Sequence, residues 1–264
     1  MVHDITKNPP ATAPAAPSVW DRAHWQITLG LLLVISGAAF EALAVATILP
    51  ATVRDLGGLN LYGWAFSAFM LANLVGITIA GAEADRQGPA RPLILGAGVF
   101  VVGLLIVGFA PSMLVVIAGR AVQGFGSGVI SSVAYVSIGR GYPEALKPRM
   151  LAMSASAWVI PGLIGRALAG VIADMLGWRW VFLGLVPFIL LGAGLALPGL
   201  RPLSGNSDSP REWRTARLAV MLAAGAGMAL AALTTPNTLL AVALGVAGLA
   251  LGIPSLLQLL PAGT

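Results

Sequence analysis

Residues 27–50 read ITLGLLLVISGAAFEALAVATILP, and Glu41 is the only charged side chain among them. A helix needs about 20 apolar residues to cross a hydrocarbon core of roughly 30 Å. This stretch is longer than the apolar core of a signal peptide, and no convincing series of small residues marks a cleavage site. We therefore expect a transmembrane helix that is retained in the protein.

The composition extends this interpretation to the whole chain. Of the 264 residues, 58% are hydrophobic and 9% are charged, whereas soluble domains have about 45–50% and 25%. Because so few charges cannot wet the surface of a soluble fold, lipid must contact much of this protein. The chain has no cysteine, and His3 and His24 both precede the first apolar stretch. Disulfides, thiolate chemistry and imidazole metal sites are therefore not expected, and neither a metal nor a cofactor is predicted.

Other function classes find little support in the sequence. The basic residues are scattered among apolar segments and form no stripe with aromatic residues between them, so nucleic acid is not an expected partner. No nucleophile–base pair or phosphate-binding loop is recognisable, so we do not expect an enzyme. The expected partner is the lipid bilayer around a multi-pass membrane protein.

Uncharged stretches separated by charged or turn-forming residues predict eight transmembrane helices. As a single helix, the 47 uncharged residues after Arg217 would extend about 70 Å, so we divide them at Thr-Pro-Asn, residues 235–237. A proline-rich tail, residues 1–25, is expected to be disordered, and residues 201–217 are expected to form a polar cytoplasmic linker. The expected helices cover about residues 27–50, 62–83, 93–110, 113–139, 150–173, 180–200 and two segments of 218–264.

The distribution of charge predicts the orientation of these helices. If the N-terminus is cytoplasmic, eleven of the 15 basic residues fall in cytoplasmic loops and two, Arg54 and Arg179, fall outside. The remaining two, Arg120 and Arg166, lie within expected helices. Cytoplasmic loops of membrane proteins carry an excess of lysine and arginine. Both termini are therefore expected in the cytoplasm.

Two segments resemble signatures of the major facilitator superfamily. The turn between the second and third expected helices resembles the family's G-x-x-x-D-R-x-G-x-x-R sequence, and the fourth helix carries a sequence similar to R-x-x-Q-G-x-G. An arginine within a span costs about 2.5–3.5 kcal/mol on insertion scales, so it is expected to face a polar partner. The matching stretches are Gly81-Ala-Glu-Ala-Asp85-Arg86-Gln-Gly88-Pro-Ala-Arg91 and Arg120-Ala-Val-Gln123-Gly124-Phe-Gly126.

Further segments resemble the drug:proton antiporters of this superfamily, specifically the fourteen-helix type. Residues 40–50 resemble the first-helix pattern of these proteins, with Glu41 where an aspartate is common. Residues 177–182 resemble the W-R-W-x-F sequence that opens the sixth helix. Residues 158–170 resemble the fifth-helix motif, although isoleucines replace two of its glycines. The residues expected to form the kink of that helix are Pro161, Gly162 and Gly165.

The resemblance implies an all-α membrane protein. Residues 26–200 would form a six-helix bundle of two inverted three-helix repeats, and residues 218–264 would add two transmembrane helices. This bundle corresponds to the N-terminal half of a transporter, so the chain is expected to be incomplete. It would need a C-terminal half or self-association to act. Without such a partner, Glu41 and Arg120 are expected to face lipid.

The resemblance also implies a function. The protein would export small amphipathic organic molecules in exchange for protons, by alternating access across a bacterial cytoplasmic (inner) membrane. Glu41 would carry the proton, and Arg120 would bias its binding. The cytoplasmic gate would comprise Gly81, Asp85, Arg86, Gly88 and Arg91. The expected lining of the substrate cavity is Phe40, Phe69, Asn73, Gln123, Trp158 and Arg166.

Several alternatives remain open at this point. Glu41 and Arg120 could form a purely structural ion pair, or Arg120 could extend its charge to the membrane surface. Arg166 stands where the antiporters have an uncharged residue, and together with Arg120 it would favour a facilitator for another substrate class, such as an anionic metabolite. The third alternative is an inactive, truncated half-transporter.

Overall fold

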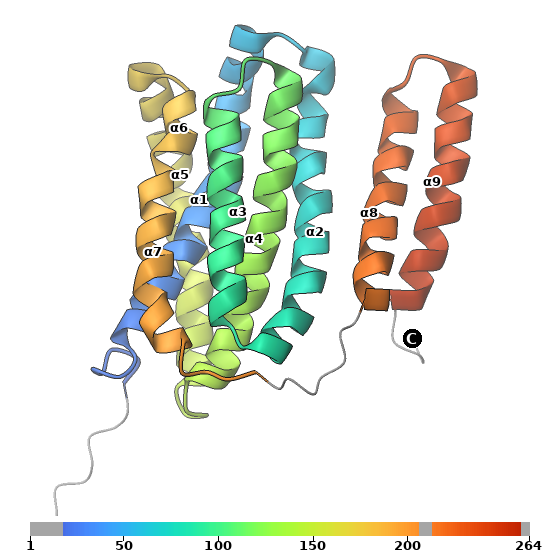
Figure 1. The fold of residues 1–264 in the computed structure, drawn as a ribbon. Coiled ribbons are helices and arrows are strands. Elements are labelled where there is room, and N and C mark those ends of the chain that lie inside the picture. Colours follow the sequence, from blue (N-terminus) through green and yellow to red (C-terminus); the bar gives the residue numbers. More distant parts are fainter. Residues whose placement is uncertain (1–17, 206–212, 260–264) are drawn as a thin grey trace, which may run out of the picture.

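The structure, a computed structural model, describes residues 18–205 and 213–259, and these residues form helices joined by short turns (Figure 1). Within these described residues, eight helical segments are long and apolar enough to cross a membrane, which agrees with the number expected from the sequence. The sixth of them consists of two helices that meet at Gly184. The elements are α1 (Trp25–Leu56), η1 (Leu59–Leu61), α2 (Tyr62–Gln87), α3 (Ala90–Gly108), α4 (Met113–Gly141), α5 (Lys147–Leu176), α6 (Arg179–Leu183), α7 (Leu185–Leu200), α8 (Trp213–Thr234) and α9 (Thr238–Leu259).

Most helices extend beyond the stretches expected from the sequence. α1 continues through Pro50 to Leu56, and α5 continues through Pro161. Proline removes a backbone donor, but membrane helices tolerate it because neighbouring groups satisfy the freed carbonyl. Gly88, with a φ of +81°, provides the left-handed residue that the tight turn between α2 and α3 requires. The helices expected from the charge pattern were too short, because charged residues at the ends of the spans also adopt helical conformation.

The limits expected for the tail and the linker were also wrong. Residues 1–17, 206–212 and 260–264 lie outside the described residues, but residues 18–24 form an ordered turn. Val19 is fully buried in this turn, and its carbonyl oxygen accepts a hydrogen bond from Thr28 Oγ1 at 2.7 Å. α8 begins at Trp213, within the stretch assigned to the linker. The composition of this segment predicted disorder up to residue 25. Composition could not reveal that Val19 is buried against the helices.

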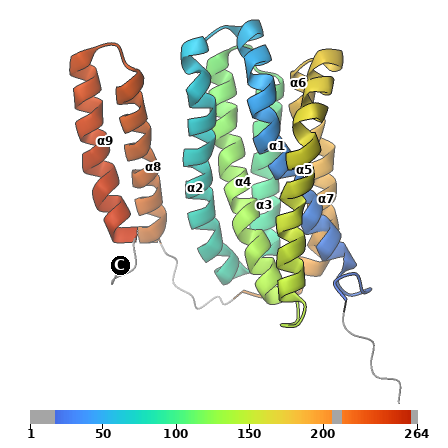
Figure 2. The ribbon, with the colours of Figure 1, turned by 180° about the vertical axis from the view of Figure 1, so that it is seen from behind.

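The six-helix bundle shows an exchange of partners between its two halves (Figures 1 and 2). α1 packs mainly against α5 and α7, whereas α4 packs mainly against α2 and α3. Exchanging α1 with α4, α2 with α5, and α3 with α7 reproduces these main pairings. Inverted three-helix repeats produce such an exchange. It makes α1 and α4 the two helices on which the others pack.

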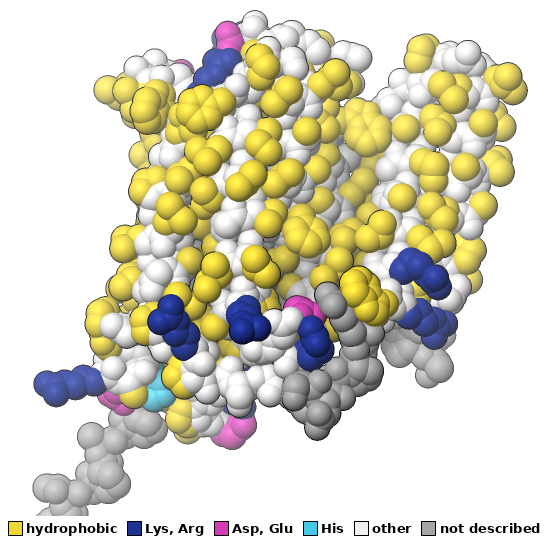
Figure 3. Space-filling view, in the orientation of Figure 1, with side chains coloured by type: hydrophobic (Ala, Val, Ile, Leu, Met, Phe, Trp, Pro, Cys, Tyr) yellow, Lys and Arg dark blue, Asp and Glu magenta, His cyan; other side chains and the backbone are white. Residues whose placement is uncertain are grey.

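Hydrophobic side chains cover the long surface of the molecule, and charged side chains gather near its two ends (Figure 3). We call the end where α1 begins the proximal end and the end where α1 terminates the distal end. Trp20 and Trp25 are exposed near the proximal end, and Trp180 is exposed near the distal end. Tryptophan gathers at membrane–water interfaces. The two ends therefore mark the expected levels of the lipid headgroups.

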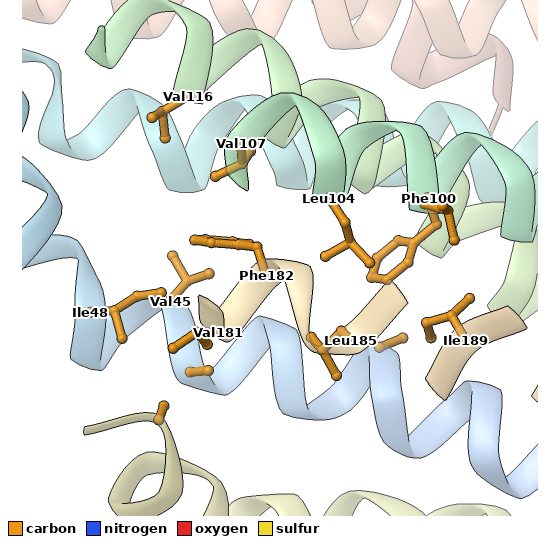
Figure 4. Packing of buried hydrophobic residues seen from close by; sticks show 14 of the residues in the cluster. Val45, Ile48, Phe100, Leu104, Val107, Val116, Val181, Phe182, Leu185 and Ile189 are labelled. Carbon is orange, nitrogen blue, oxygen red and sulfur yellow. The ribbon is translucent and has the colours of Figure 1, made fainter. Parts of the chain in front are cut away.

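Two clusters of buried hydrophobic residues hold the six-helix bundle together. Because lipid chains are as apolar as these side chains, close packing rather than exclusion of water stabilises the contacts. The distal cluster joins α1, α3, α6 and α7 (Figure 4) and includes Val45, Ile48, Leu104, Phe182 and Leu185. The proximal cluster includes Leu31, Leu93, Ile138, Met150 and Leu200.

α8 and α9 form a hairpin beside the six-helix bundle (Figure 1). Their glycines permit backbone contact, since a Cβ added to Gly225 would lie 2.6 Å from the backbone nitrogen of Gly252. α8 also packs against α2. The hairpin therefore lies against α2. It contributes no residues to the centre of the six-helix bundle, between α1 and α4.

Candidate functional site

A buried arginine joins the central helices. Arg120 on α4 donates a hydrogen bond from Nη1 to Oε1 of Glu41 on α1, and the same nitrogen donates to Oε1 of Gln123 at 3.1 Å. Gln123 lies about one turn after Arg120, so both side chains leave α4 on the same face. Arg120, Glu41 and Gln123 are 2%, 1% and 0% exposed. The structure thus brings together the two residues expected to couple protons and one residue expected in the cavity.

α2 supplies two further contacts to this arginine. Nε of Arg120 donates to the carbonyl oxygen of Ala65 at 3.2 Å. The guanidinium carbon lies 4.2 Å from the centre of the Phe69 ring, where the face of the ring attracts a cation. Phe69 is itself buried, so it contacts Arg120 in this arrangement. Its expected contact with a substrate stays a prediction.

Glycines on α4 permit these contacts because they let α2 approach backbone to backbone. A Cβ at Gly124 would lie 2.1 Å from the carbonyl oxygen of Phe69, and one at Gly128 would lie 2.2 Å from that of Asn73. Asn73 donates from Nδ2 to the carbonyl oxygen of Gly124 at 3.3 Å, so its side chain joins the two helices. The R-x-x-Q-G-x-G sequence therefore combines a charged group with the small residues that position its partners.

The expectation that Glu41 and Arg120 face lipid was wrong. α1, α2 and α4 enclose both side chains within the described part of the chain. Taking each ion out of water costs several kcal/mol, so the pair needs mutual compensation and additional hydrogen bonds. Oε2 of Glu41 and Nε2 of Gln123 have no hydrogen-bond partner among the described residues. These two atoms are buried hydrogen-bonding groups that the described residues leave unsatisfied.

The other residues expected to line one cavity lie in different places. Phe40 and Pro161 line a cavity of about 390 Å³ between α1, α5, α6 and α7. A Cβ at Gly165 would lie 3.2 Å from the Phe40 ring, whereas one at Gly162 would meet nothing within 4 Å. Arg166 is exposed on α5 and has no ion-pair partner in the described ranges. The expected lining therefore does not form a single site in this structure.

A second cavity, of about 220 Å³, lies between α1, α4 and α5. Trp158 lines it together with Ser131, Tyr135 and Ser154. Small-molecule sites typically combine apolar and aromatic walls with a few polar groups that fix orientation. Sequence reasoning did not identify Tyr135, although a lone tyrosine in the apolar fourth span was an available signal.

Asp85, expected in the cytoplasmic gate, is paired with α4 at the proximal end. Its Oδ1 lies 2.8 Å from Nη2 of Arg140, near the end of α4. Arg140 Nη1 also donates to the carbonyl oxygens of Ala84, Asp85 and Ser204 at 3.5, 3.4 and 3.4 Å. One arginine therefore links α2, α4 and the segment that follows α7. Sequence reasoning used Arg140 for orientation and did not place it in the gate.

The remaining gate residues make local or backbone contacts. Arg86 pairs with Glu83 one turn earlier at 2.9 Å, and Arg91 donates to Gln87 at 3.5 Å. A Cβ at Gly81 would lie 3.3 Å from Ser132 Oγ on α4, and one at Gly88 would lie 2.3 Å from the carbonyl oxygen of Leu203. The glycines therefore allow close approach of α4 and of residues 203–205 to the turn between α2 and α3.

Comparison with known families identifies this arrangement. Residues 29–263 match the Major Facilitator Superfamily. The chain belongs to this superfamily. It is therefore a multi-pass membrane protein, and its signature sequences correspond to the proximal turn and to the buried arginine on α4 described above.

Relatives within the superfamily have names that refer to drug efflux. A probable multidrug-efflux transporter of Mycobacterium tuberculosis is 28% identical over 224 residues, which cover 80% of this chain and 46% of that protein. Multidrug resistance protein 3 of Bacillus subtilis is 32% identical over 161 residues, which cover 61% of this chain and 31% of that protein. The chain thus spans about half the length, or less, of these curated relatives.

The superfamily fold is also visible in a solved structure. The crystal structure of a D-xylose–proton symporter superposes with a TM-score of 0.56 at 15% sequence identity. The match covers 89% of this chain and 66% of that chain. At this identity the likeness concerns the fold alone, and it supports the arrangement of helices around α1 and α4.

Proposed function

We propose that the protein exports small amphipathic organic molecules in exchange for protons, by alternating access across a bacterial cytoplasmic membrane. Membership of the superfamily and relatives named for multidrug efflux support export and the substrate class. The excess of arginine and lysine in proximal loops supports an orientation with both termini in the cytoplasm. The observation that carries proton coupling is the buried pair of Glu41 and Arg120.

Glu41 is the proton carrier in this proposal. While its carboxylate is ionised, Arg120 compensates the charge inside the bundle. Protonation removes the negative charge, and Arg120 then retains its hydrogen bonds to Gln123 and to the carbonyl oxygen of Ala65. These neutral partners hold the arginine on α2 and α4 while the carboxyl group is released. α1 can then move relative to α4, which links the protonation state of Glu41 to the direction in which the cavity opens.

The substrate binds, in this proposal, in the cavity between α1, α4 and α5. Trp158 offers an apolar face there, and Ser131 and Tyr135 offer hydroxyl groups. Such a combination suits a molecule with an apolar body and a polar group. Ile35 of α1 lines the same cavity and precedes Glu41 on the same helix. α1 is therefore common to the substrate cavity and to the proton carrier.

We also propose that transport requires further helices in addition to those of this chain. Alternating access in the superfamily moves two halves around a central site. α2 and α5 offer faces for such contacts, because far fewer of their residues are buried than of those in α1 and α4. The additional helices come from a C-terminal half or from a second copy of this chain.

Proton-driven uptake into inverted membrane vesicles tests the coupling. Glu41→Gln keeps the shape of the side chain but cannot ionise, so a transporter that contains this bundle should lose gradient-driven uptake and keep substrate binding. Glu144→Gln is the matched control, because Glu144 is an exposed carboxylate in the turn before α5, and its uptake should be normal. Full gradient-driven uptake by Glu41→Gln, or an equal loss in both variants, would overturn the assignment.

A facilitator for an anionic metabolite is the second candidate, and Arg166 is the observation that favours it. An arginine within a span that lacks an ion-pair partner among the described residues is costly in lipid, and such residues commonly mark a substrate pathway. Arg166 is exposed on α5 rather than next to Arg120. The two arginines therefore do not form a joint anion site in this arrangement.

A further inference from the structure

A groove runs along α1 between α5 and α7. Both helices pack against α1, and α6 contacts α5 before it leads into α7 at the distal end (Figure 2). The space between them is the cavity of about 390 Å³ that Phe40 lines. Its floor includes Gly37 of α1 and the buried side chains of Val181 and Leu185. The longest wall of the cavity belongs to α5, whose lining residues extend from Ile160 to Ile172.

The wall that α5 forms is open to the outside of the bundle. Ile160 and Ile164 line the groove and are 63% and 56% exposed. From Ile160 to Ile172 the wall extends about 18 Å at 1.5 Å per residue, and half of the hydrocarbon core is about 15 Å thick. Ser36 and Trp180 alone, among the described side chains that line the groove, carry a polar atom. The dimensions and the chemistry fit a single hydrocarbon chain within one leaflet.

A polar cavity of about 400 Å³ adjoins the groove at the distal end, and Trp180 lines both. Arg179 and Asp55 supply its charges, with Nη1 of Arg179 2.7 Å from Oδ2 of Asp55. The same carboxylate oxygen accepts a hydrogen bond from Trp178 Nε1 at 3.1 Å. Arg179 and Asp55 are 39% and 49% exposed. Tryptophan marks the level of lipid headgroups, so the charged pair lies where a headgroup would lie above the groove.

We propose that the groove and the polar cavity together form a binding site for a membrane phospholipid with a primary ammonium headgroup. One acyl chain lies between α5 and α7, along Phe40 and Ile164. The phosphate accepts charge-assisted hydrogen bonds from Arg179, and the ammonium group donates to Asp55. A zwitterionic headgroup matches the two opposite charges that the distal cavity presents.

The geometry favours a lipid over the other molecules that could occupy this groove. A further transmembrane helix that packs on α5 is about 10–12 Å in diameter with its side chains, too wide to enter the groove, so it would cover the mouth of the groove without taking the place of an acyl chain inside it. An exported molecule would need polar groups in the wall to fix its orientation, and the groove wall is almost wholly apolar. The site does not involve Glu41 or Arg120, so the inference is independent of proton-coupled export.

Photolabelling of the full chain in nanodiscs tests the acyl-chain part of the proposal. The nanodiscs contain phosphatidylethanolamine and phosphatidylglycerol, with a trace of phosphatidylethanolamine that carries a diazirine in one acyl chain, and mass spectrometry locates the labelled residues. Groove residues should be labelled, and Ile164→Trp should reduce their labelling by about tenfold, because even two methylenes displaced from an apolar site cost about that factor. Leu163→Trp is the matched control, since Leu163 is the next residue on α5, is 77% exposed and does not line the groove.

Several outcomes would overturn this part. Labelling that Ile164→Trp leaves unchanged, or that falls equally in Leu163→Trp, would show ordinary contact with bulk lipid. Loss of labelling on addition of an amphipathic drug, without displacement of labels elsewhere on the surface, would show that an exported molecule occupies the groove. Leu168→Trp, which fills the same groove from the next turn of α5, repeats the test if Ile164→Trp does not give a folded protein by circular dichroism.

Competition between unlabelled lipids tests the headgroup part. Phosphatidylethanolamine should displace the photolabelled lipid from the groove more effectively than phosphatidylcholine or phosphatidylglycerol. Asp55→Asn should abolish the advantage over phosphatidylglycerol, which has no cationic group, because the amide cannot compensate an ammonium charge. Arg54→Ala, at the exposed residue next to Asp55, should leave the preference intact. Equal displacement by all three lipids in the unmodified protein would rule out the proposed headgroup contacts.

Discussion

Arg120 and Glu41 lie 79 residues apart in the chain, and their side chains meet inside the bundle with 2% and 1% of their surfaces exposed. The contact joins α4 to α1, the two helices on which the other helices of the bundle pack. A charge change at this pair therefore acts directly between the central helices. In low-dielectric surroundings each charge depends on the other, because removal of one partner leaves an uncompensated ion.

Arg120→Ala should lower the free energy of unfolding by about 3–5 kcal/mol, because it leaves the Glu41 carboxylate buried without its cation. The double variant with Glu41→Gln should be more stable than Arg120→Ala alone. Arg120→Lys should recover only part of the loss, since lysine lacks the planar set of donors that reaches Glu41, Gln123 and Ala65 together. Unfolding in mixed detergent micelles measures these differences.

The control for this series is Arg149→Ala, because Arg149 is exposed at the start of α5. Its effect should stay within about 0.5 kcal/mol, as for most surface substitutions. If Arg120→Ala were no more harmful than this control, the pair would not stabilise the bundle. If the double variant were as unstable as Arg120→Ala, the loss would come from packing and not from the stranded carboxylate.

Gly124→Ala should separate α2 from α4, because the added Cβ would lie 2.1 Å from the carbonyl oxygen of Phe69. We expect a loss of about 1–3 kcal/mol, typical of overpacking, together with a weaker contact between Arg120 and the α2 backbone. Gly139→Ala on the same helix is the control, since a Cβ there meets nothing within 4 Å, and it should be neutral or stabilise the helix by up to about 1 kcal/mol. Equal stabilities of the two variants would contradict backbone contact between α2 and α4.

Much of this fold could be predicted because lipid imposes strict conditions on a sequence. A charge-free stretch of sufficient length has few alternatives to a transmembrane helix, and Glu41 and Arg120 stand out within such stretches because charges there are costly. The partners of Arg120 on α2 could not be predicted in the same way. Ala65 contributes a backbone oxygen, which no side-chain pattern reveals. The close approach of α2 depends on glycines of α4, and the sequence does not show which neighbouring helix those glycines face.

The division of the expected substrate cavity has a similar cause. Phe40 on α1 and Trp158 on α5 lie within spans, as expected, but they line different cavities, one between α1, α5, α6 and α7 and the other between α1, α4 and α5. Residue type alone cannot distinguish these directions. Arg140 was overlooked for a different reason. The positive-inside pattern already explained its charge, so a specific contact with Asp85 was not expected.

Asp85→Asn should lower the rate of transport more than it lowers stability. Asp85 and Arg140 are 57% and 33% exposed, and exposed pairs contribute about 0–1 kcal/mol, so the fold should remain intact. If the pair acts as part of the cytoplasmic gate, exchange of the two charges by Asp85→Arg with Arg140→Asp should restore part of the rate. Glu144→Gln removes a comparable proximal pair with Lys147 and serves as the control. Equal rates in Asp85→Asn and Glu144→Gln would argue against a gate at Asp85.

The absence of cysteine makes single-cysteine variants a direct test of orientation. Leu59→Cys lies in the exposed distal turn after α1, and Ala145→Cys lies in the exposed proximal turn before α5. A membrane-impermeant maleimide should label Leu59→Cys in intact cells and Ala145→Cys only in inverted vesicles, because loops rich in arginine and lysine stay in the cytoplasm. The reverse pattern would place the proximal end outside the cell.

Arg166→Leu distinguishes the two candidate functions. Arg166 is exposed on α5, ten residues before the helix ends at Leu176. If the protein exports cationic or neutral amphipathic molecules, this arginine is not required, and its removal should preserve their transport. It should also stabilise the protein in nanodiscs by up to about 2.5–3.5 kcal/mol, the insertion cost of a charge at this depth. We expect both results, measured as proton-driven uptake and as a shift in the unfolding midpoint.

Arg149→Leu provides the comparison for this variant, because it removes an equal charge from the exposed start of α5. It should change neither the uptake of cations nor the unfolding midpoint, since its charge already lies in water. If the protein is instead a facilitator for anions, Arg166 should be required for transport. The unmodified transporter would then carry anionic substrates in preference to cations, and Arg166→Leu would abolish that uptake while Arg149→Leu preserved it. Because stabilisation and transport are measured on the same preparations, a charge that is merely costly in lipid is separated from one that contacts the transported molecule.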